Sequence, residues 1–288
     1  MRLATVRTAD GRTSAAVEDA GTWRALPAAN LGQLLTADER ILRARSLAEL
    51  DLLELLGGPL EDARPGTPLP RPAKVVCCGL NYADHITEMG RELPRFPTLF
   101  AKFADTLTGP TDQIEVPADV DLDWEGELAV VVGRTVHRAD EATALEAIAG
   151  YTVANDISVR DWQNRTLQWL QGKAWDATTP VGPVMVTVDE VDPEAGLEVT
   201  CEVNGSTVQR GNTRTLVFGP AALVAYISQF TTLRPGDLVL TGTPGGVGMG
   251  MTPPRFLCDG DVVRTHVEGI GALENTIRLT RTPPEETS

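Results

Sequence analysis

The stretch Asp121-Leu122-Asp123-Trp124-Glu125-Gly126-Glu127 leads directly into Leu128-Ala129-Val130-Val131-Val132-Gly133. The second part is an unbroken apolar run rich in valine, which is typical of a strand buried on both faces at the centre of a sheet. The first part places Glu125 and Glu127 two residues apart, so both carboxylates project from the same face of an extended chain. We therefore expect a central strand that begins at an acidic site.

Short strand patterns surround this segment on both sides. They fall at 75–78, 151–156, 238–241 and 259–279, and a hairpin pattern covers 197–209 around Asn204-Gly205. Helical patterns are fewer and fall at 30–56, at 82–89, at 140–149 with Asp140 as N-cap, and at 220–229 with proline in the first turn. Because strands outnumber helices, the sequence predicts an α+β fold that is mostly β.

A proline-rich stretch, residues 64–72, divides the chain. Proline removes amide donors and fixes φ, so this stretch is typical of a linker. The sequence therefore predicts a small strand and helix domain over residues 1–71 and a larger catalytic domain over residues 72–288.

Composition excludes several classes of protein. The formal net charge is −15, so a phosphate backbone would be repelled and a nucleic-acid partner is not expected. No apolar run is long enough for a membrane span, and the first residues lack a signal-peptide pattern, so we expect a cytoplasmic protein. Four cysteines without a Cys-x-x-Cys motif favour reduced, buried thiols, and three histidines exclude a histidine-rich metal site.

The acidic pair Glu125 and Glu127 has two interpretations. Two carboxylates this close repel each other and need a proton or a cation between them, and oxygen-only ligands suit Mg²⁺, Mn²⁺ or Ca²⁺. Asp156, where a strand pattern stops, is a candidate third carboxylate. The alternatives are a solvated acidic strand edge for the pair and a helix cap or turn for Asp156.

Two further segments carry candidate chemistry. On a helix, His85 and Glu88 lie three residues apart and can hydrogen-bond, which fixes the imidazole tautomer and raises its basicity toward a water molecule. Lys173 lies in a loop framed by glycine and proline and is a candidate for holding an anionic or enolate oxygen. A surface pair and an exposed lysine are the respective alternatives. The glycine-rich stretch 241–248 favours a carboxylate over a nucleotide, because no phosphate-loop lysine follows it.

The order of the motifs is more specific than any one of them. Residues 79–90, Phe100-Ala101-Lys102, 123–128, 155–163, Gly172-Lys173 and 233–244 follow one another in a succession that resembles the fumarylacetoacetate hydrolase family over roughly residues 72–280. The resemblance implies a mixed β-roll or β-sandwich-like core, a homodimer and a bound Mg²⁺ or Mn²⁺, with Ca²⁺ as a substitute in crystals.

The resemblance also implies roles for individual residues. The metal ligands would be Glu125, Glu127 and Asp156, and the catalytic residues would be His85, Glu88 and Lys173. Substrate-binding residues implied in the same way are Tyr82, Arg160, Gln163 and Thr243.

These roles imply a metal-dependent hydrolase or decarboxylase that cleaves a C–C bond in 2-oxo or β-diketo acids, of the acylpyruvate or oxaloacetate type, through a stabilised enolate. The alternatives are an isomerase or tautomerase of an unsaturated dioxo acid, of the 2-hydroxyhepta-2,4-diene-1,7-dioate type, and a non-catalytic metabolite-binding member.

Two positions depart from the family pattern. Ala174-Trp175 stands where serine and phenylalanine are common, and Arg214 replaces a smaller polar residue. Both changes allow a larger or more hydrophobic substrate than usual. Trp162, Trp169 and Trp175 fit that expectation, although core packing or a dimer interface would also explain them.

Overall fold

Strand β11 (Gly126–Val132) lies inside the largest sheet of the computed structural model, between β12 (Ile148–Asn155) and β17 (Leu238–Leu240). The structure describes residues 1–280 except 38, 43, 45, 89 and 91, and for residues 39, 42, 85 and 88 it describes the backbone alone. Within these residues strands predominate, so the mostly-β α+β fold expected from the sequence is confirmed.

The largest sheet has the order β4-β3-β2-β1-β14-β12-β11-β17-β6-β7, with β5 paired to β1 and β8 paired to β14. Its remaining strands are β1 (Arg2–Arg7), β2 (Thr13–Asp19), β3 (Thr22–Ala25), β4 (Pro59–Leu60), β5 (Arg64–Pro65), β6 (Val75–Gly79), β7 (Thr98–Lys102), β8 (Leu107–Thr108) and β14 (Thr179–Thr187). A second sheet has the order β16-β15-β18-β19-β9, formed by β9 (Ile114–Pro117), β15 (Glu198–Val203), β16 (Ser206–Asn212), β18 (Val262–Val267) and β19 (Gly271–Thr280). The short strands β10 (Leu122–Asp123) and β13 (Ser158–Val159) pair with each other.

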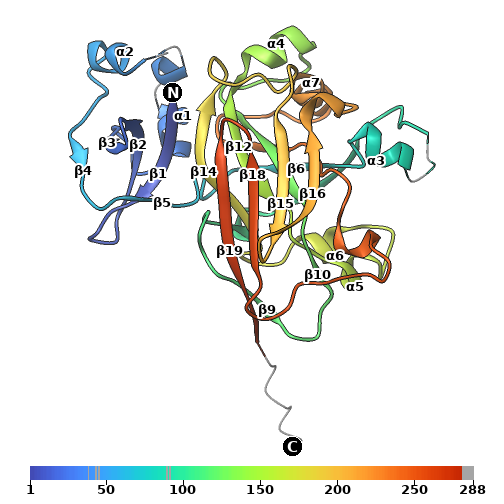
Figure 1. Ribbon diagram of the computed structural model, residues 1–288. Helices are drawn as coiled ribbons and strands as arrows, with labels where there is room; N and C mark the ends of the chain where they lie inside the picture. Colours follow the sequence, from blue (N-terminus) through green and yellow to red (C-terminus); the bar gives the residue numbers. More distant parts are fainter. Residues whose placement is uncertain (38, 43, 45, 89, 91, 281–288) are drawn as a thin grey trace, which may run out of the picture.

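Helices are short and lie around the sheets (Figure 1). They are α1 (Leu31–Ala37), α2 (Leu47–Leu52), α3 (Ala83–Glu88), α4 (Glu141–Glu146), α5 (Arg160–Gln163), α6 (Leu170–Lys173) and α7 (Pro220–Ser228). Single 3₁₀ turns are η1 (Glu39–Leu42), η2 (Ala104–Thr106), η3 (Thr213–Thr215) and η4 (Gly248–Gly250). No described helix is both long and apolar enough to cross a membrane.

The apolar run of β11 contributes to two cores. Leu128, Val130 and Val132 join a cluster that includes buried residues of the second sheet and of α7, whereas Ala129 and Val131 join a cluster that includes α1 and β6. Successive side chains of a strand point to opposite faces, so a strand covered on both sides must be apolar at every position. The sequence prediction of a central strand is confirmed.

Residues 1–71 contribute strands to the same large sheet. Leu3 of β1 pairs with Met185 of β14, and Figure 1 shows β1–β5, α1 and α2 on the side of β14 away from the second sheet's labelled strands β15 and β16. Leu31 and Leu34 of α1 share a core with Leu238 of β17. The domain boundary at residue 71 stays a prediction.

The hairpin, two of the helices and the cysteines can each be compared with the sequence prediction. The hairpin is confirmed, with both Asn204 and Gly205 at positive φ, and Pro220 begins α7. The helix predicted over 140–149 is capped by Asp140 but ends at Glu146, because Ile148 already pairs with Val132 in the sheet. The four cysteines are free thiols as expected, but Cys258 is exposed, which corrects the expectation that all are buried.

Candidate functional site

A cavity of about 350 Å³ opens where β6, β7, α5, α6 and Glu125, the residue before β11, meet the loop that follows β17. One part of its wall is polar and is formed by Glu125, Arg160, Gln163, Asn164, Lys173 and Thr243. The other part is apolar and is formed by Leu80, Phe100, Trp169, Val247 and Met249. The cavity therefore joins charged groups to an aromatic surface.

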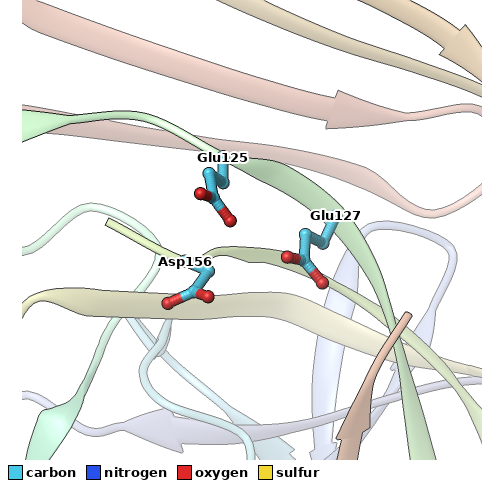
Figure 2. A group of neighbouring side chains, drawn as sticks. All are labelled: Glu125, Glu127 and Asp156. Carbon is cyan, nitrogen blue, oxygen red and sulfur yellow. The ribbon is translucent and has the colours of Figure 1, made fainter. Parts of the chain in front are cut away.

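Three carboxylates meet beside the polar wall. Carboxylate oxygens of Glu125, Glu127 and Asp156 lie within 4.8 Å of one another, and Figure 2 shows the three side chains around one region. The sheet register explains the approach: Gly126 pairs with Asn155, and the amide of Asp156 donates to the carbonyl of Glu125 at 2.8 Å. Glu125 and Asp156 are thereby brought together although they lie far apart in the sequence.

Buried amide side chains fix this corner of the sheet. Asn155 Oδ1 accepts a hydrogen bond from the Glu125 amide at 2.9 Å, and Gln209 Oε1 accepts one from the Gly126 amide at 2.9 Å. Gln209 Nε2 also donates to Thr243 Oγ1 at 2.8 Å. The backbone that carries the acidic pair is thus held to the loop that carries Thr243.

Buried cations pair with two of the three carboxylates. Lys173 Nζ donates to Glu125 Oε2 at 2.8 Å and to Asp156 Oδ2 at 2.7 Å, and Lys102 Nζ donates to Asp156 Oδ1. Arg160 Nη1 lies 2.6 Å from Glu125 Oε1. Among the described residues Glu127 has no ion pair, and its Oε2 accepts the Gly242 amide at 2.7 Å. Gly242 has φ +96°, a conformation that favours glycine.

The pKa directions follow from this arrangement. Burial raises the pKa of the Glu127 carboxyl well above its usual range, and the neighbouring charges of Asp156 and Glu125 raise it further. Burial would also raise the pKa of Asp156, but the charges of Lys102 and Lys173 outweigh it and lower that pKa. Glu127 is thus a buried carboxylate that faces two others, and added positive charge would stabilise its ionised form.

The residues present fit a divalent cation. The donors are carboxylate oxygens alone, two of the three side chains are fully buried, and Glu127 has no cation of its own among the described residues. Hard cations such as Mg²⁺ and Mn²⁺ prefer such oxygen donors. The group could therefore hold a metal ion.

Asp123 is a buried carboxylate that holds Arg160 of the polar wall in place. Its buried carboxylate accepts the amides of Trp124, Gly248 and Met249 at 2.8, 2.7 and 2.9 Å. It also accepts Arg160 Nε at 2.8 Å, whereas the buried Arg160 Nη2 has no partner. Arg160 lines the cavity, so Asp123 fixes the orientation of a guanidinium at its wall, one of whose buried nitrogens has no partner.

The apolar wall is closely packed. The rings of Phe100 and Trp169 make an edge-to-face contact with centroids 5.5 Å apart, and Lys173 Nζ lies 5.1 Å from the Phe100 centroid. A β-carbon added at Gly79 would come within 2.6 Å of the Trp169 ring, so the indole lies directly over this glycine. The aromatic surface therefore begins next to the charged groups.

The structure places the residues singled out in the sequence in different surroundings. Arg160, Gln163, Lys173 and Thr243 line the cavity together with Glu125. Tyr82 is buried and lines a separate hollow that includes Gly211 and Pro244. The side chains of His85 and Glu88, on α3, lie outside the described part of the structure.

The two departures from the family pattern lie outside the cavity wall. Trp175 makes an edge-to-face contact with Trp162, at 5.3 Å between centroids, and its indole nitrogen donates to the Gln171 carbonyl. Arg214 hydrogen-bonds Asn212. Neither Trp175 nor Arg214 lines the cavity, so neither changes its shape by direct contact. Of Trp162, Trp169 and Trp175, only Trp169 lines it.

Sequence reasoning gave no role to Lys102, Asp123 or Gln209. Lys102 and Asp123 each lie inside a motif that supports the family resemblance. Only the structure shows that their charged side chains are buried. Cys78 also lines the cavity, but burial raises the pKa of its thiol to about 12, so it is a protonated, weak nucleophile near neutral pH.

A family model described as fumarylacetoacetate (FAA) hydrolase C-terminal matches residues 74–278. The chain belongs to this family. Among curated fumarylacetoacetate hydrolase-family relatives, the mitochondrial oxaloacetate tautomerase FAHD2A of Homo sapiens is 46% identical over 213 residues, which cover 73% of this chain and 68% of that protein. The Xenopus laevis oxaloacetate tautomerase fahd2 is 45% identical over 73% of this chain and 67% of its own length.

Solved structures of the family cover nearly the whole chain. The fumarylacetoacetate hydrolase of Exiguobacterium antarcticum has a TM-score of 0.84 at 36% identity, over 97% of this chain and 100% of that chain. The 5-carboxymethyl-2-hydroxymuconate delta-isomerase of Mycobacterium smegmatis has a TM-score of 0.79 at 36% identity, over 98% and 100%. The chain is thus a member of a family of enzymes that act on small molecules.

Proposed function

We propose that this protein is a divalent-metal-dependent enzyme that cleaves a C–C bond in 2-oxo or β-diketo acids, as a hydrolase or decarboxylase. The observation that carries the proposal is the group of three carboxylates, of which Glu125 lines the cavity together with Lys173 and Arg160, while Glu127 and Asp156 lie buried behind it. In the proposal Mg²⁺ or Mn²⁺, held by Glu125, Glu127 and Asp156, supplies charge that stabilises an enolate.

The residues of the chain have separate tasks in this proposal. The Arg160 guanidinium and the Lys173 ammonium, which both line the cavity, bind the carboxylate and the developing enolate oxygen of the substrate. Thr243 and Gln163 orient the substrate from the wall of the same cavity. These groups are held in place before substrate binds, which lowers the cost of reorganisation during the reaction.

For an acylpyruvate, His85 would take a proton from water, with Glu88 fixing the imidazole tautomer. The water oxygen then bonds to the distal carbonyl carbon, the C–C bond between that carbon and the enolate carbon breaks, and the electron pair forms the pyruvate enolate. The enolate takes up a proton to give pyruvate, and the acyl fragment leaves as a carboxylic acid. For oxaloacetate, the corresponding bond to the distal carboxylate breaks and CO₂ leaves.

A second candidate is a tautomerase or isomerase. The printed names of the relatives, oxaloacetate tautomerase and 5-carboxymethyl-2-hydroxymuconate delta-isomerase, favour it. An enolate of the intact substrate would form by loss of a proton from carbon, and the proton would return to another atom of the enolate, with a C–H bond broken but no C–C bond. The two candidates share every group of the cavity and differ in their need for an activated water.

The experiment follows the absorbance of acetylpyruvate and oxaloacetate with metal-stripped protein and again after addition of Mg²⁺. Cleavage that appears only with Mg²⁺ supports the first candidate, whereas keto–enol exchange without loss of carbon supports the second. His85→Ala should lower hydrolysis by roughly 10²- to 10⁴-fold, the range for loss of a general base. If Mg²⁺ binds but neither substrate is turned over, the result favours a non-catalytic, metabolite-binding protein.

Metal ligation has its own test. Glu127→Gln keeps the shape of the side chain but removes its charge, so calorimetry should detect little Mg²⁺ binding while circular dichroism shows an unchanged fold. Unaltered Mg²⁺ affinity in this variant would show that the ligand set is wrong. The homodimer and the cytoplasmic location stay proposals. Sedimentation velocity would test the first, since a dimer has twice the 30.8 kDa mass of the chain, and cell fractionation would test the second.

A further inference from the structure

The cavity is larger than a short dicarboxylic oxo acid requires. Its volume of about 350 Å³ is roughly that of a dozen water molecules in the liquid, at about 30 Å³ each. Oxaloacetate has nine non-hydrogen atoms and would fill only part of it. The remaining space lies against side chains whose chemistry indicates what occupies it.

The charged and the apolar parts of the wall adjoin at Phe100. Lys173 Nζ lies 5.1 Å from the Phe100 ring centroid, and the Trp169 ring lies 5.5 Å beyond, centroid to centroid. A 2-oxo acid whose carboxylate and keto oxygens meet Lys173 and Arg160 therefore has aromatic surface within reach of its next carbon atoms. Burial of apolar area there would be favourable.

The aromatic surface has a fixed position. Gly79 has no side chain, and the Trp169 ring occupies the space that a β-carbon would take. The edge-to-face contact with Phe100 holds the indole from another side. A rigid, oriented aromatic wall is a feature of pockets that select apolar groups by shape.

A second carboxylate at the distal end of a substrate would find no free cation on the described wall. Arg160 and Lys173 are the cations among its described residues, and both pair with buried carboxylates, Asp123 and Glu125 for Arg160 and Glu125 and Asp156 for Lys173. Moving a carboxylate from water to the surface of Phe100 and Trp169 without a partner is costly.

We propose that the substrate is a 2-oxo acid whose distal end is apolar, a branched alkyl or aryl group that packs against Phe100 and Trp169, in place of a second carboxylate. The proposal rests on the function proposed above for the same cavity, because it assumes that a 2-oxo carboxylate lies at the charged end. Trp169 is its specificity-determining residue.

Binding of stable 2-oxo acids tests this without turnover. The matched pair is 5-methyl-2-oxohexanoate and 2-oxoglutarate, which have nearly the same shape and differ in an isopropyl group against a carboxylate. Titration calorimetry in the presence of Mg²⁺ should give a Kd for the apolar acid that is roughly tenfold or more below that for 2-oxoglutarate, the discrimination expected of an apolar pocket. Pyruvate, which has no distal group, serves as the reference for the charged end.

Trp169→Ala should remove most of this preference and leave the Kd of pyruvate within about threefold of the wild-type value. Trp23→Ala is the matched control, since Trp23 lies on β3 and outside the cavity wall. Trp23→Ala should change neither the preference for the apolar acid nor the Kd of pyruvate. Circular dichroism confirms that each variant is folded.

The outcomes separate the two proposals. Equal or tighter binding of 2-oxoglutarate, or a Trp169→Ala variant that keeps the preference, overturns the apolar-tail inference and leaves the proposed function in place. If Trp169→Ala does not fold, Trp169→Phe, which shortens the ring system, should lower the preference and gives the same decision. Failure of all three acids to bind overturns both proposals, because the charged end then does not accept a 2-oxo carboxylate.

Discussion

Four donors converge on one buried carboxylate at Asp123: three backbone amides and the Arg160 guanidinium. Asparagine in its place would turn an NH₂ group toward at least one of these donors and leave the arginine without a counter-charge on that side. Removing one partner of a buried ion pair costs about 3–5 kcal/mol. Asp123→Asn should therefore lower the free energy of unfolding by about 3 kcal/mol or more, measured by urea denaturation.

The matched control for this prediction is Asp19→Asn. Asp19 pairs with Arg24 at 3.5 Å on the surface, and exposed pairs contribute about 0–1 kcal/mol. If the two variants lose the same stability, Asp123 is no more important to the fold than a surface acid. A selective loss would show that the buried Asp123 carboxylate stabilises the fold more than a surface acid does.

The acidic group was predictable from sequence and its surroundings were not. Alternation along a strand places Glu125 and Glu127 on one face, and a strand that stops at Asp156 offers a third carboxylate. Lys102 and Asp123 carry no such periodic signal, because their importance lies in burial next to partners 54 and 37 positions away. Patterns within one segment cannot reveal these distant contacts.

At the scale of elements, the hairpin between β15 and β16 depends on its turn. Asn204 and Gly205 have φ of +52° and +75°, which is the two-residue turn whose twist matches the strands. Gly205→Ala should lower stability by roughly 1–2 kcal/mol, the cost of a side chain in the left-handed region. Thermal unfolding measures the loss.

Gly58→Ala is the control for the turn. A β-carbon at Gly58 would meet nothing within 4 Å and its φ is not positive, so this substitution should be neutral or slightly stabilising. A Gly205→Ala variant as stable as Gly58→Ala would contradict the role given to the turn.

The boundaries of elements were harder to predict than their type. Asp140 caps α4 as expected, but the helix ends at Glu146 because Ile148 is recruited into the pairing of β12 with β11. Residues 147–149 are alanine, isoleucine and alanine, which suit a helix or a buried strand equally well. Pairing with β11, and not a local preference of these residues, decides between helix and strand.

At the scale of the whole molecule, Arg7 on β1 forms a two-pronged contact with Asp112, which lies between β8 and β9. Hydrogen bonds from Arg7 lower the pKa of Asp112 below its usual range. The stabilisation from this pair is thus fully present above the unfolded-state pKa of about 3.9 and is lost as the pH falls through the lower folded-state pKa.

Asp112→Asn should accordingly be less stable than the wild type at pH 7, by no more than about 1 kcal/mol because the pair is partly exposed. The difference should shrink below pH 4, as followed by urea denaturation at several pH values. A difference that stays constant or grows as the pH falls would contradict this assignment. Arg7→Gln removes the same pair from the other side and should show the same trend.

The arrangement of the sheets was foreseen in class but not in connectivity. The proline-rich stretch at 64–72 predicted a small N-terminal domain, and in the structure β1 of this part pairs with β14 in the large sheet. Leu3 and Met185 pair although they are far apart in the sequence, and the apolar pattern of each strand shows that the strand is buried but not which strand lies beside it. Folding of the isolated fragments 1–71 and 72–288 would therefore test the division into domains.

The contact between Gly79 and the Trp169 ring has a consequence for descent. A residue larger than glycine at position 79 would displace the Trp169 ring from its present place, so we expect the two positions to change together. In related sequences an alanine or serine at the first position should accompany a smaller residue at the second, as co-varying pairs in contact do. A lineage that shifts to a different substrate would then change both positions together, and the pair would mark the branch on which the preference changed.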